Sequence, residues 1–221
     1  FEEIVEAIGL RDMLVSRGVS EEVRQQLAYT YDKMLDYCKS VRQYSISPGN
    51  FAGGLTTIEE KSMGALVKSG SRPIQGVTKG AVPPTRPGLW LLDSTPDSYW
   101  MQFGITNPND NEGLMDLISC GAHIVFLVTG RGSVVGSAVS PCIKITGNHA
   151  TFERMSEDME FDASPILAGV KSRDGMAEEL ARHVVDIAAG ELSKSEAMGH
   201  KEFYIPYKYQ DKNIPPKVCE Q

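Results

Sequence analysis

Cysteine is scarce in this sequence, and its four cysteines are widely spaced. Cys38, Cys120, Cys142 and Cys219 include no CxxC pair. The spacing therefore excludes a disulfide-rich scaffold and a structural zinc site, and it is typical of proteins of the reducing cytoplasm. We expect a cytoplasmic protein in which Cys120 and Cys142, which lie in apolar stretches, are small core residues.

Positive charge and long apolar runs are also lacking. The 22 lysines and arginines are outnumbered by 29 acidic residues, which gives a net charge of −7. Binding to nucleic acid depends on clustered positive charge, so we exclude nucleic acid as a partner. No apolar run approaches the roughly 20 residues of a membrane span, so we also expect no membrane partner. Because the chain begins with Phe1 and not with Met, we expect a piece of a longer protein that is incomplete at its N-terminus.

The pattern that remains predicts a single α/β domain over residues 1–221. Hydrophobic residues make up 41% of the chain, which is enough for a sizeable core. Short apolar runs predict strands at residues 89–92, 123–128 and 141–146, and such runs are typical of parallel sheets that are covered on both faces. The proline-rich residues 71–88 predict an irregular connection. Helical spacing and capping residues predict helices at residues 7–17, 20–41, 57–70, 112–120, 149–159 and 173–189.

A glycine-rich turn directly follows the predicted strand at residues 123–128. In open α/β sheets, ligands bind beyond the carboxyl ends of the strands. Glycines there allow backbone N–H groups to form a nest around an anion, and an arginine adds a planar fork for a carboxylate. The alternative interpretation is a tight turn with a surface arginine. We predict that the turn binds the acid group of a small anionic substrate through Thr129, Gly130, Arg131, Gly132 and Ser133.

A second glycine-rich loop, residues 47–54, precedes the predicted helix at residues 57–70. A loop that leads into a helix N-terminus can hold an anion, which makes Asn50, Gly53 and Gly54 candidate substrate ligands. Glu60 and Lys61 fall in the first turns of that helix, where a partly buried lysine can act as a base. The alternatives are that Glu60 completes a capping box with Thr57 and that Lys61 lies on a solvated face.

Acidic and basic residues in other predicted strands give further candidates. Glu3 and Glu6 follow an apparent strand end and are candidate metal ligands, with Glu6 also a candidate base; the alternative is that both are solvated carboxylates. Asp93 follows the strand at residues 89–92 and is a weaker candidate. Lys144 lies within an apolar strand, so we expect it either to reach the substrate or to extend outwards to water.

Taken in order, these motifs resemble the C-terminal region of the altronate/galactarate dehydratase family, to which the large subunit of sulfolactate sulfo-lyase also belongs. The similarity covers most of the chain at family-like spacings. It consists of Phe1-x-Glu-x-x-Glu6, Ser47-Pro-Gly-Asn50 with Gly53-Gly-Leu55, Glu60-Lys61 with Gly64 and Lys68-Ser-Gly70, Pro84-Thr85 with Gly88-Leu89, Thr129-Gly-Arg-Gly132 with Gly136, and Pro141-x-Ile-Lys144.

The resemblance implies a Rossmann-like, three-layer parallel sheet with helices on both faces and an unusual crossover. It implies a divalent metal, iron as Fe2+ in the active enzymes, with Mn2+ or Mg2+ as alternatives. The reaction implied is β-elimination from a small anionic hydroxy acid. Glu6, Glu60 and Lys61 are then the candidate acid–base residues, with their individual roles left open. Upstream family domains or a separate small subunit are implied as partners, and a homo-oligomer is an alternative.

The chain departs from the family pattern in ways that concern the substrate. Ser133-Val134 follows the turn where the sugar-acid dehydratases have Thr-Pro, and Glu160-Phe-Asp-Ala-Ser164 replaces Asp-Ile-Asn-Ala-Gly. Residues 197–203 are more similar to the sulfo-lyase branch. Three interpretations follow: a dehydratase for altronate, galactarate or a related sugar acid, a sulfo-lyase for 3-sulfolactate, and a non-catalytic anion-binding or subunit-interaction domain.

Overall fold

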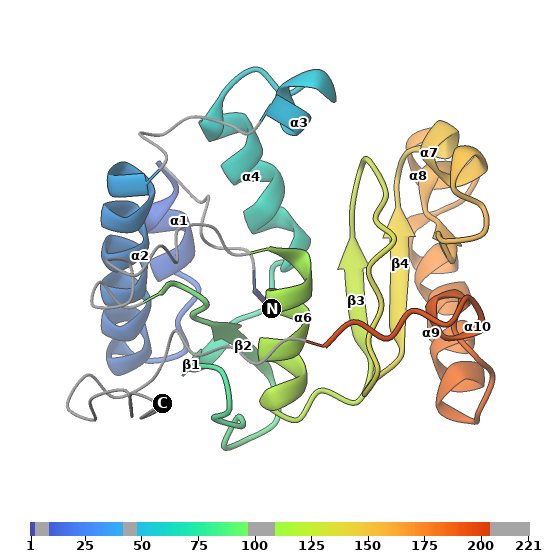
Figure 1. The fold of residues 1–221 in the computed structure, drawn as a ribbon. Helices are drawn as coiled ribbons and strands as arrows, with labels where there is room; N and C mark the ends of the chain where they lie inside the picture. Colours follow the sequence, from blue (N-terminus) through green and yellow to red (C-terminus); the bar gives the residue numbers. More distant parts are fainter. Residues whose placement is uncertain (3–8, 42–47, 97–108, 204–221) are drawn as a thin grey trace, which may run out of the picture. The chain divides into compact units, whose positions relative to one another are not determined.

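The computed structural model describes residues 1–2, 9–41, 48–96 and 109–203. These residues form two compact units, each with its own small parallel sheet (Figure 1). Unit 1 extends to Asp116 and unit 2 begins at Leu117. The predicted α/β class is thus confirmed, while the single Rossmann-like sheet and the single domain over residues 1–221 stay predictions. Among the described residues, no helix has the length and apolar character needed to cross a membrane.

Unit 1 is built from helices around a sheet of two parallel strands. The sheet pairs β1 (Ile74–Thr78) with β2 (Leu89–Leu92). Phe1 lies beside β2, since its carbonyl accepts a hydrogen bond of 2.8 Å from the Leu92 N–H. The helices are α1 (Arg11–Val15), α2 (Glu21–Val41), α3 (Pro48–Ala52), α4 (Ile58–Lys68) and the first turns of α6 (Asp110–Ser119).

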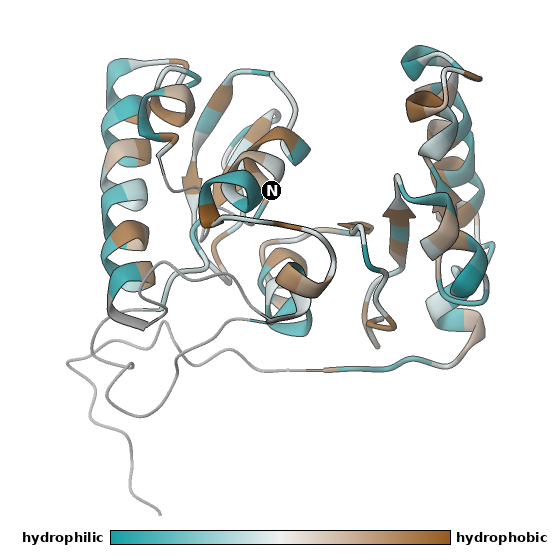
Figure 2. Ribbon diagram, turned by 90° about the horizontal axis from the view of Figure 1, so that it is seen from above, coloured by the Kyte–Doolittle hydropathy of each residue, from teal (hydrophilic) through white to brown (hydrophobic). Residues whose placement is uncertain are grey.

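The long helix α2 supplies much of the core of unit 1. It begins after Ser20, whose hydroxyl accepts a hydrogen bond from the Val23 N–H, as the sequence predicts. Hydrophobic and hydrophilic bands alternate along α2 (Figure 2), because one helical face carries the apolar residues. The buried core contains Leu14, Val23, Leu27, Tyr31, Met34, Tyr37, Cys38, Leu66, Ile74 and Leu91.

The prediction of an irregular connection over residues 71–88 is wrong, because this segment contains β1. Burial alternates along β1, with Ile74, Gly76 and Thr78 buried. The prolines before and after the strand conceal this short period-two pattern in the sequence. Gly76 pairs with Trp90 in the neighbouring strand, and a Cβ atom at position 76 would lie 2.5 Å from the indole ring.

Unit 2 contains three parallel strands in the order β3 (Val125–Val128), β4 (Cys142–Thr146) and β5 (Phe161–Asp162). The central strand β4 is fully buried, and Ile143 and Ile145 pack against Ile187. The strand β3 was expected to be covered on both faces, but it lies at the edge of this sheet. Its residues Phe126 and Val128 are 46% and 40% exposed. The helices are α7 (His149–Arg154), α8 (Ser164–Leu167), α9 (Arg173–Ala188) and α10 (Lys194–Ala197).

Most predicted helices are confirmed, with changes at their ends. Thr57 caps α4 and Ser172 caps α9, as predicted. The helix predicted at residues 149–159 is shorter, because α7 ends at Arg154 and Met155 leaves the helical region at φ −118°. Residues 48–52 form the short helix α3 inside the predicted glycine loop.

We predict that Gly76→Ala destabilises unit 1. The new methyl group would overlap the ring of Trp90, whose indole N–H is held by the carbonyl of Arg86 at 3.0 Å. Overpacking of this kind costs about 1–3 kcal/mol, measurable by urea unfolding. Gly64→Ala is the matched control, because α4 leaves open space there and alanine favours a helix by roughly 0.5–1 kcal/mol. Equal effects of the two changes would contradict the argument.

Candidate functional site

The turn at residues 129–132 leaves the sheet of unit 2 at the carboxyl end of β3, as the sequence predicts. The Thr129 N–H donates to the Ile145 carbonyl at 3.0 Å and so continues the β3–β4 ladder by one step. The chain then reverses with Gly132 at φ +86°. The Gly132 N–H donates to the Thr129 hydroxyl at 3.2 Å. Because the Gly132 N–H already donates inside the turn, a bound anion would need other hydrogen-bond donors. The exposed Arg131 is one such donor.

The helix α7 packs against the turn and fixes its shape. The Thr151 hydroxyl donates to the Gly130 carbonyl at 2.8 Å, and Arg154 donates to the Arg131 carbonyl at 3.2 Å. A Cβ atom at position 132 would lie 2.3 Å from the sulfur of Met155, whereas one at position 130 would meet nothing within 4 Å. Gly132 is therefore required both by its φ angle and by the close approach of α7.

The carboxyl end of the same sheet also holds a histidine–aspartate pair that the sequence reasoning missed. His149 follows β4 and Asp162 ends β5, and the His149 Nδ1 lies 2.7 Å from an Asp162 carboxylate oxygen. Glu153 lies 3.5 Å from the other ring nitrogen. The signal available in the sequence is position: neighbouring parallel strands bring the residues that follow them to one edge.

Hydrogen bonds and charges shift the pKa values of this pair in opposite directions. The hydrogen bond to Asp162 and the nearby charge of Glu153 raise the pKa of His149. Burial tends to raise the pKa of Asp162, but hydrogen bonds from Ser164 and His149 outweigh it, and the pKa is lowered overall. The two groups thus favour an ion pair at the edge that carries the turn, and a cationic His149 adds positive charge there.

Lys144 does not take one of the two positions expected from the sequence. Its side chain is 0% exposed, so the prediction that it extends to water is wrong. The ammonium nitrogen lies 3.7 Å from an oxygen of Asp158. The side chain is buried because it projects from the central strand β4, a position that the sequence of one strand does not reveal. Contact with a substrate stays a prediction for Lys144. Ser133 is half-buried, and its hydroxyl accepts a hydrogen bond from the Val135 N–H at 3.3 Å.

The second predicted anion loop lies in unit 1. The Leu55 N–H donates to the Asn50 carbonyl at 3.2 Å, and this closes the turn after α3. Gly54 has φ +100°, which explains the glycine at this position, and both Gly53 and Gly54 are exposed. The loop is therefore a compact turn before α4, and its role in substrate binding stays a prediction.

Glu60 caps α4 in the structure. Its carboxylate accepts hydrogen bonds from the N–H and the hydroxyl of Thr56 at 2.8 and 2.7 Å. The Thr57 hydroxyl accepts from the Glu60 N–H at 3.2 Å. The bonds from Thr56 lower the pKa of Glu60, which makes its carboxylate a weaker base. The capping interpretation is confirmed in part, because Thr57 caps α4 while the Glu60 carboxylate accepts from Thr56 and not from the Thr57 N–H. Catalytic roles of Glu60 and of the half-buried Lys61 stay predictions.

A buried polar cluster follows β2, where the sequence pointed only to Asp93. The Lys33 ammonium lies 3.1 Å from a carboxylate oxygen of Asp93 and donates to the Thr95 carbonyl at 3.1 Å. Asp93, Ser94 and Thr95 are at most 2% exposed. The hydroxyl of Ser94 donates to the carboxylate of Glu2. Lys33 belongs to α2, so only the tertiary fold brings it to Asp93.

The described residues do not supply a metal site by themselves. They include no group of three or more His, Cys, Asp or Glu side chains that could hold a metal ion. The predicted ligands Glu3 and Glu6 lie outside the described residues. The described geometry therefore gives no support for a metal site in this chain. We derive no chemical step that uses a metal ion.

Comparison with known proteins identifies relatives along nearly the whole chain. Residues 1–210 match the family described as D-galactarate/altronate dehydratase, C-terminal. The beta subunit of (2R)-sulfolactate sulfo-lyase from Chromohalobacter salexigens is 31% identical over 217 residues, which are 95% of this chain and 52% of that protein. Altronate dehydratase from Bacillus subtilis is 30% identical over 214 residues, with 92% of this chain and 39% of that enzyme covered.

A third relative has a similar degree of identity. Galactarate dehydratase (L-threo-forming) from Escherichia coli is 30% identical over 193 residues, with 86% of this chain and 35% of that enzyme covered. The chain thus spans between about a third and about half of the length of these three relatives.

We predict that Gly132→Ala destabilises unit 2, whereas Gly130→Ala does not. Alanine at 132 combines an unfavourable positive φ with overlap on Met155, at a cost of about 1–3 kcal/mol. Alanine at 130 meets open space, so its effect should stay within about 0.5 kcal/mol. Urea unfolding of both variants measures this. A larger loss at 130 than at 132 would contradict the described turn.

We predict that Asp162→Asn lowers the pKa of His149 toward its ordinary value of 6.5. The raised pKa means that the pair stabilises the fold below the unfolded-state pKa, and that this contribution is lost as pH rises through the folded-state pKa. The pKa of Asp162 is lowered from 3.8, so the contribution is also lost as acid protonates that group. NMR titration of the ring measures the shift. Asp174→Asn in α9 is the control, and an equal shift there would refute the pairing.

Proposed function

Because the chain belongs to the D-galactarate/altronate dehydratase family, we propose that it is the acid-binding C-terminal part of a lyase that removes water from a sugar acid such as altronate or galactarate. The observation that supports this proposal is the turn at residues 129–132. It lies at the carboxyl edge of a parallel sheet, is held by α7 and presents Arg131. A planar guanidinium matches the two oxygens of a carboxylate.

The chemistry of dehydration explains why the acid group must be held by positive charge. A base removes the proton on the carbon next to the carboxylate, and the electron pair moves into the carboxylate to give an enediolate. The hydroxyl on the next carbon then leaves as water with a proton from an acid, and the resulting enol becomes a 2-keto-3-deoxy acid. Charge on the carboxylate rises in the first step, so donors such as Arg131 stabilise that transition state most.

The family resemblance is the basis for the acid–base residues and the metal in this proposal. Lys61, Glu60 and Glu6 are the proposed proton-transfer residues, and Glu3 and Glu6 the proposed ligands of a divalent metal, Fe2+ first. We also propose a cytoplasmic location and an assembly in which further family domains or a separate subunit complete the active site.

A sulfo-lyase is the second candidate function. One relative is named as a beta subunit of (2R)-sulfolactate sulfo-lyase and is 31% identical to this chain. The resemblance described for the sequence also favours this candidate, because Ser133-Val134 stands where Thr-Pro is expected in sugar-acid dehydratases, and residues 197–203 are more similar to the sulfo-lyase branch. In this reaction sulfite leaves in place of water, so the acid-binding role of the turn would be the same while the leaving group differs.

Ligand-dependent thermal stability tests both candidates. The protein is heated with altronate, galactarate or 3-sulfolactate, each with and without Fe2+ under reducing conditions. An acid at 100-fold over its Kd should add about 2.7 kcal/mol of stability. Arg131→Ala should weaken the binding of that acid by about 1–3 kcal/mol, because a charged hydrogen-bond partner is lost.

Arg182→Ala in α9 is the control, since this residue is also an exposed arginine of unit 2. A rise with a sugar acid supports the dehydratase, and a rise with 3-sulfolactate alone supports the sulfo-lyase. If no acid stabilises the chain, either the missing upstream part completes the site or the non-catalytic interpretation holds, and the same assay on the full-length protein decides between them. Unchanged affinity in Arg131→Ala would remove the turn from the proposal.

A further inference from the structure

The side chain of Lys144 is buried in a way that stability alone does not explain. It is 0% exposed on the central strand β4. Within the described part of the chain its ammonium makes no hydrogen bond, and its ion pair with Asp158 is long, at 3.7 Å. A buried ion pair without supporting hydrogen bonds is often no better than an apolar replacement. The burial of the Lys144 ammonium therefore needs an explanation other than its contribution to stability.

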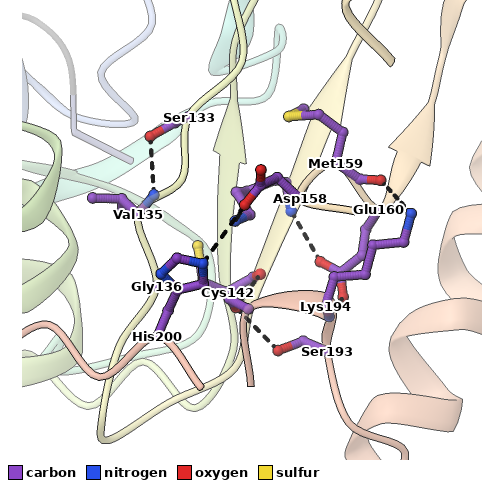
Figure 3. A network of polar contacts seen from close by, with 12 residues as sticks. Ser133, Val135, Gly136, Cys142, Asp158, Met159, Glu160, Ser193, Lys194 and His200 are labelled. Atoms are coloured by element: carbon purple, nitrogen blue, oxygen red, sulfur yellow. Dashed lines mark hydrogen bonds and ion pairs between the residues drawn. The ribbon is translucent and has the colours of Figure 1, made fainter. Parts of the chain in front are cut away.

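Asp158 is shared between Lys144 and a histidine from the segment after α10, and Figure 3 shows Asp158 beside this histidine. The same Asp158 oxygen lies 3.6 Å from the Nε2 atom of His200. The other ring nitrogen of His200 lies 3.4 Å from a carboxylate oxygen of Glu202. Basic and acidic groups thus alternate from the central strand to the segment at residues 200–202, in the order Lys144, Asp158, His200, Glu202.

Neighbouring contacts hold Asp158 in place. The Lys194 ammonium donates to the carbonyls of Ser156 and Met159, both at 2.6 Å. Glu160 accepts from the N–H of Lys144 at 3.1 Å and from the N–H of Lys194 at 2.8 Å, and so ties β4 to α10 (Figure 3). Asp158 therefore lies on a segment that is anchored on both sides.

Glu202, the last residue of this series, binds the loop that continues from the glycine turn. The Gly136 N–H donates to the Glu202 carboxylate at 3.2 Å, and the Ala138 N–H donates to the Glu202 carbonyl at 3.3 Å. A Cβ atom at position 136 would lie 2.7 Å from the Cβ of His200 and 2.9 Å from that of Ser195. Gly136 and Ala138 thus fix the loop at residues 133–140 to the segment after α10.

We propose that Lys144, Asp158, His200 and Glu202 form a positioning network that holds residues 133–140, and through them the acid-binding turn at residues 129–132, in the geometry that receives the substrate. Lys144 is then a positioning residue and not a substrate ligand. The inference rests on the proposed acid-binding function of the turn. The buried charge serves to fix one loop conformation, because the polar contacts from Lys144 to Glu202 are complete only when the segments are docked.

Amide hydrogen exchange combined with kinetics tests the network. The variants are Lys144→Met, Asp158→Asn, the double variant, and Glu202→Gln, which leaves the buried pair intact if the others fail to fold. Lys171→Met is the control, because Lys171 makes an exposed ion pair with Glu179 at 2.8 Å. Each network variant should speed exchange at Gly136 and Ala138 by about tenfold or more, with β4 unaffected, and should raise KM for the acid more than it changes kcat.

The outcomes separate the network from its alternatives. Coupling predicts that the double variant changes exchange less than the two single changes combined. A raised KM in Lys144→Met with unchanged loop exchange would make Lys144 a substrate ligand and overturn the inference. Faster loop exchange with unchanged KM would also overturn it, because the loop would not serve the acid. If the unaltered full-length protein binds no acid, the proposed function fails, and the exchange data still report whether the loop is held.

Discussion

The central strand β4 is the element on which unit 2 depends. All five of its residues are buried, so each side chain must find its partners inside the protein. One face of β4 presents Ile143 and Ile145 to the apolar core with α9. The other carries Lys144, which is paired with Asp158. A strand that is apolar on one face and carries a buried charge on the other fixes both its register and the segments that supply the counter-charge.

The candidate site depends on this strand because the neighbouring strands end beside it. The turn after β3, His149 after β4 and Asp162 at the end of β5 come from three adjacent strands of one parallel sheet. A rigid sheet with short connections is a good support for a binding turn, since loops at strand ends gain precision from the scaffold.

Local features of the sequence predicted the local structure well. The strand at 89–92, the caps Thr57 and Ser172 and the glycine turn after β3 were all predictable, because each depends on residues near one another in the chain. The pair Lys33–Asp93 was not, because only tertiary packing brings α2 to the end of β2. The pair His149–Asp162 depends on the order of the strands in the sheet, which the sequence does not state directly. The strand β1 was missed because its alternation is short and lies among prolines. Glu3 and Glu6 lie outside the described residues, so the sequence remains the only basis for their roles.

The contact between Gly76 and Trp90 has a consequence for spectroscopy. Both tryptophans of the chain, Trp90 and Trp100, fall within the sequence of unit 1, while residues 117–204 contain none. The Trp90 indole lies against the backbone of β1 and donates to the Arg86 carbonyl, so its emission is sensitive to the integrity of that sheet. Intrinsic fluorescence therefore reports on unit 1, and a tryptophan introduced into unit 2 would give each unit its own optical signal.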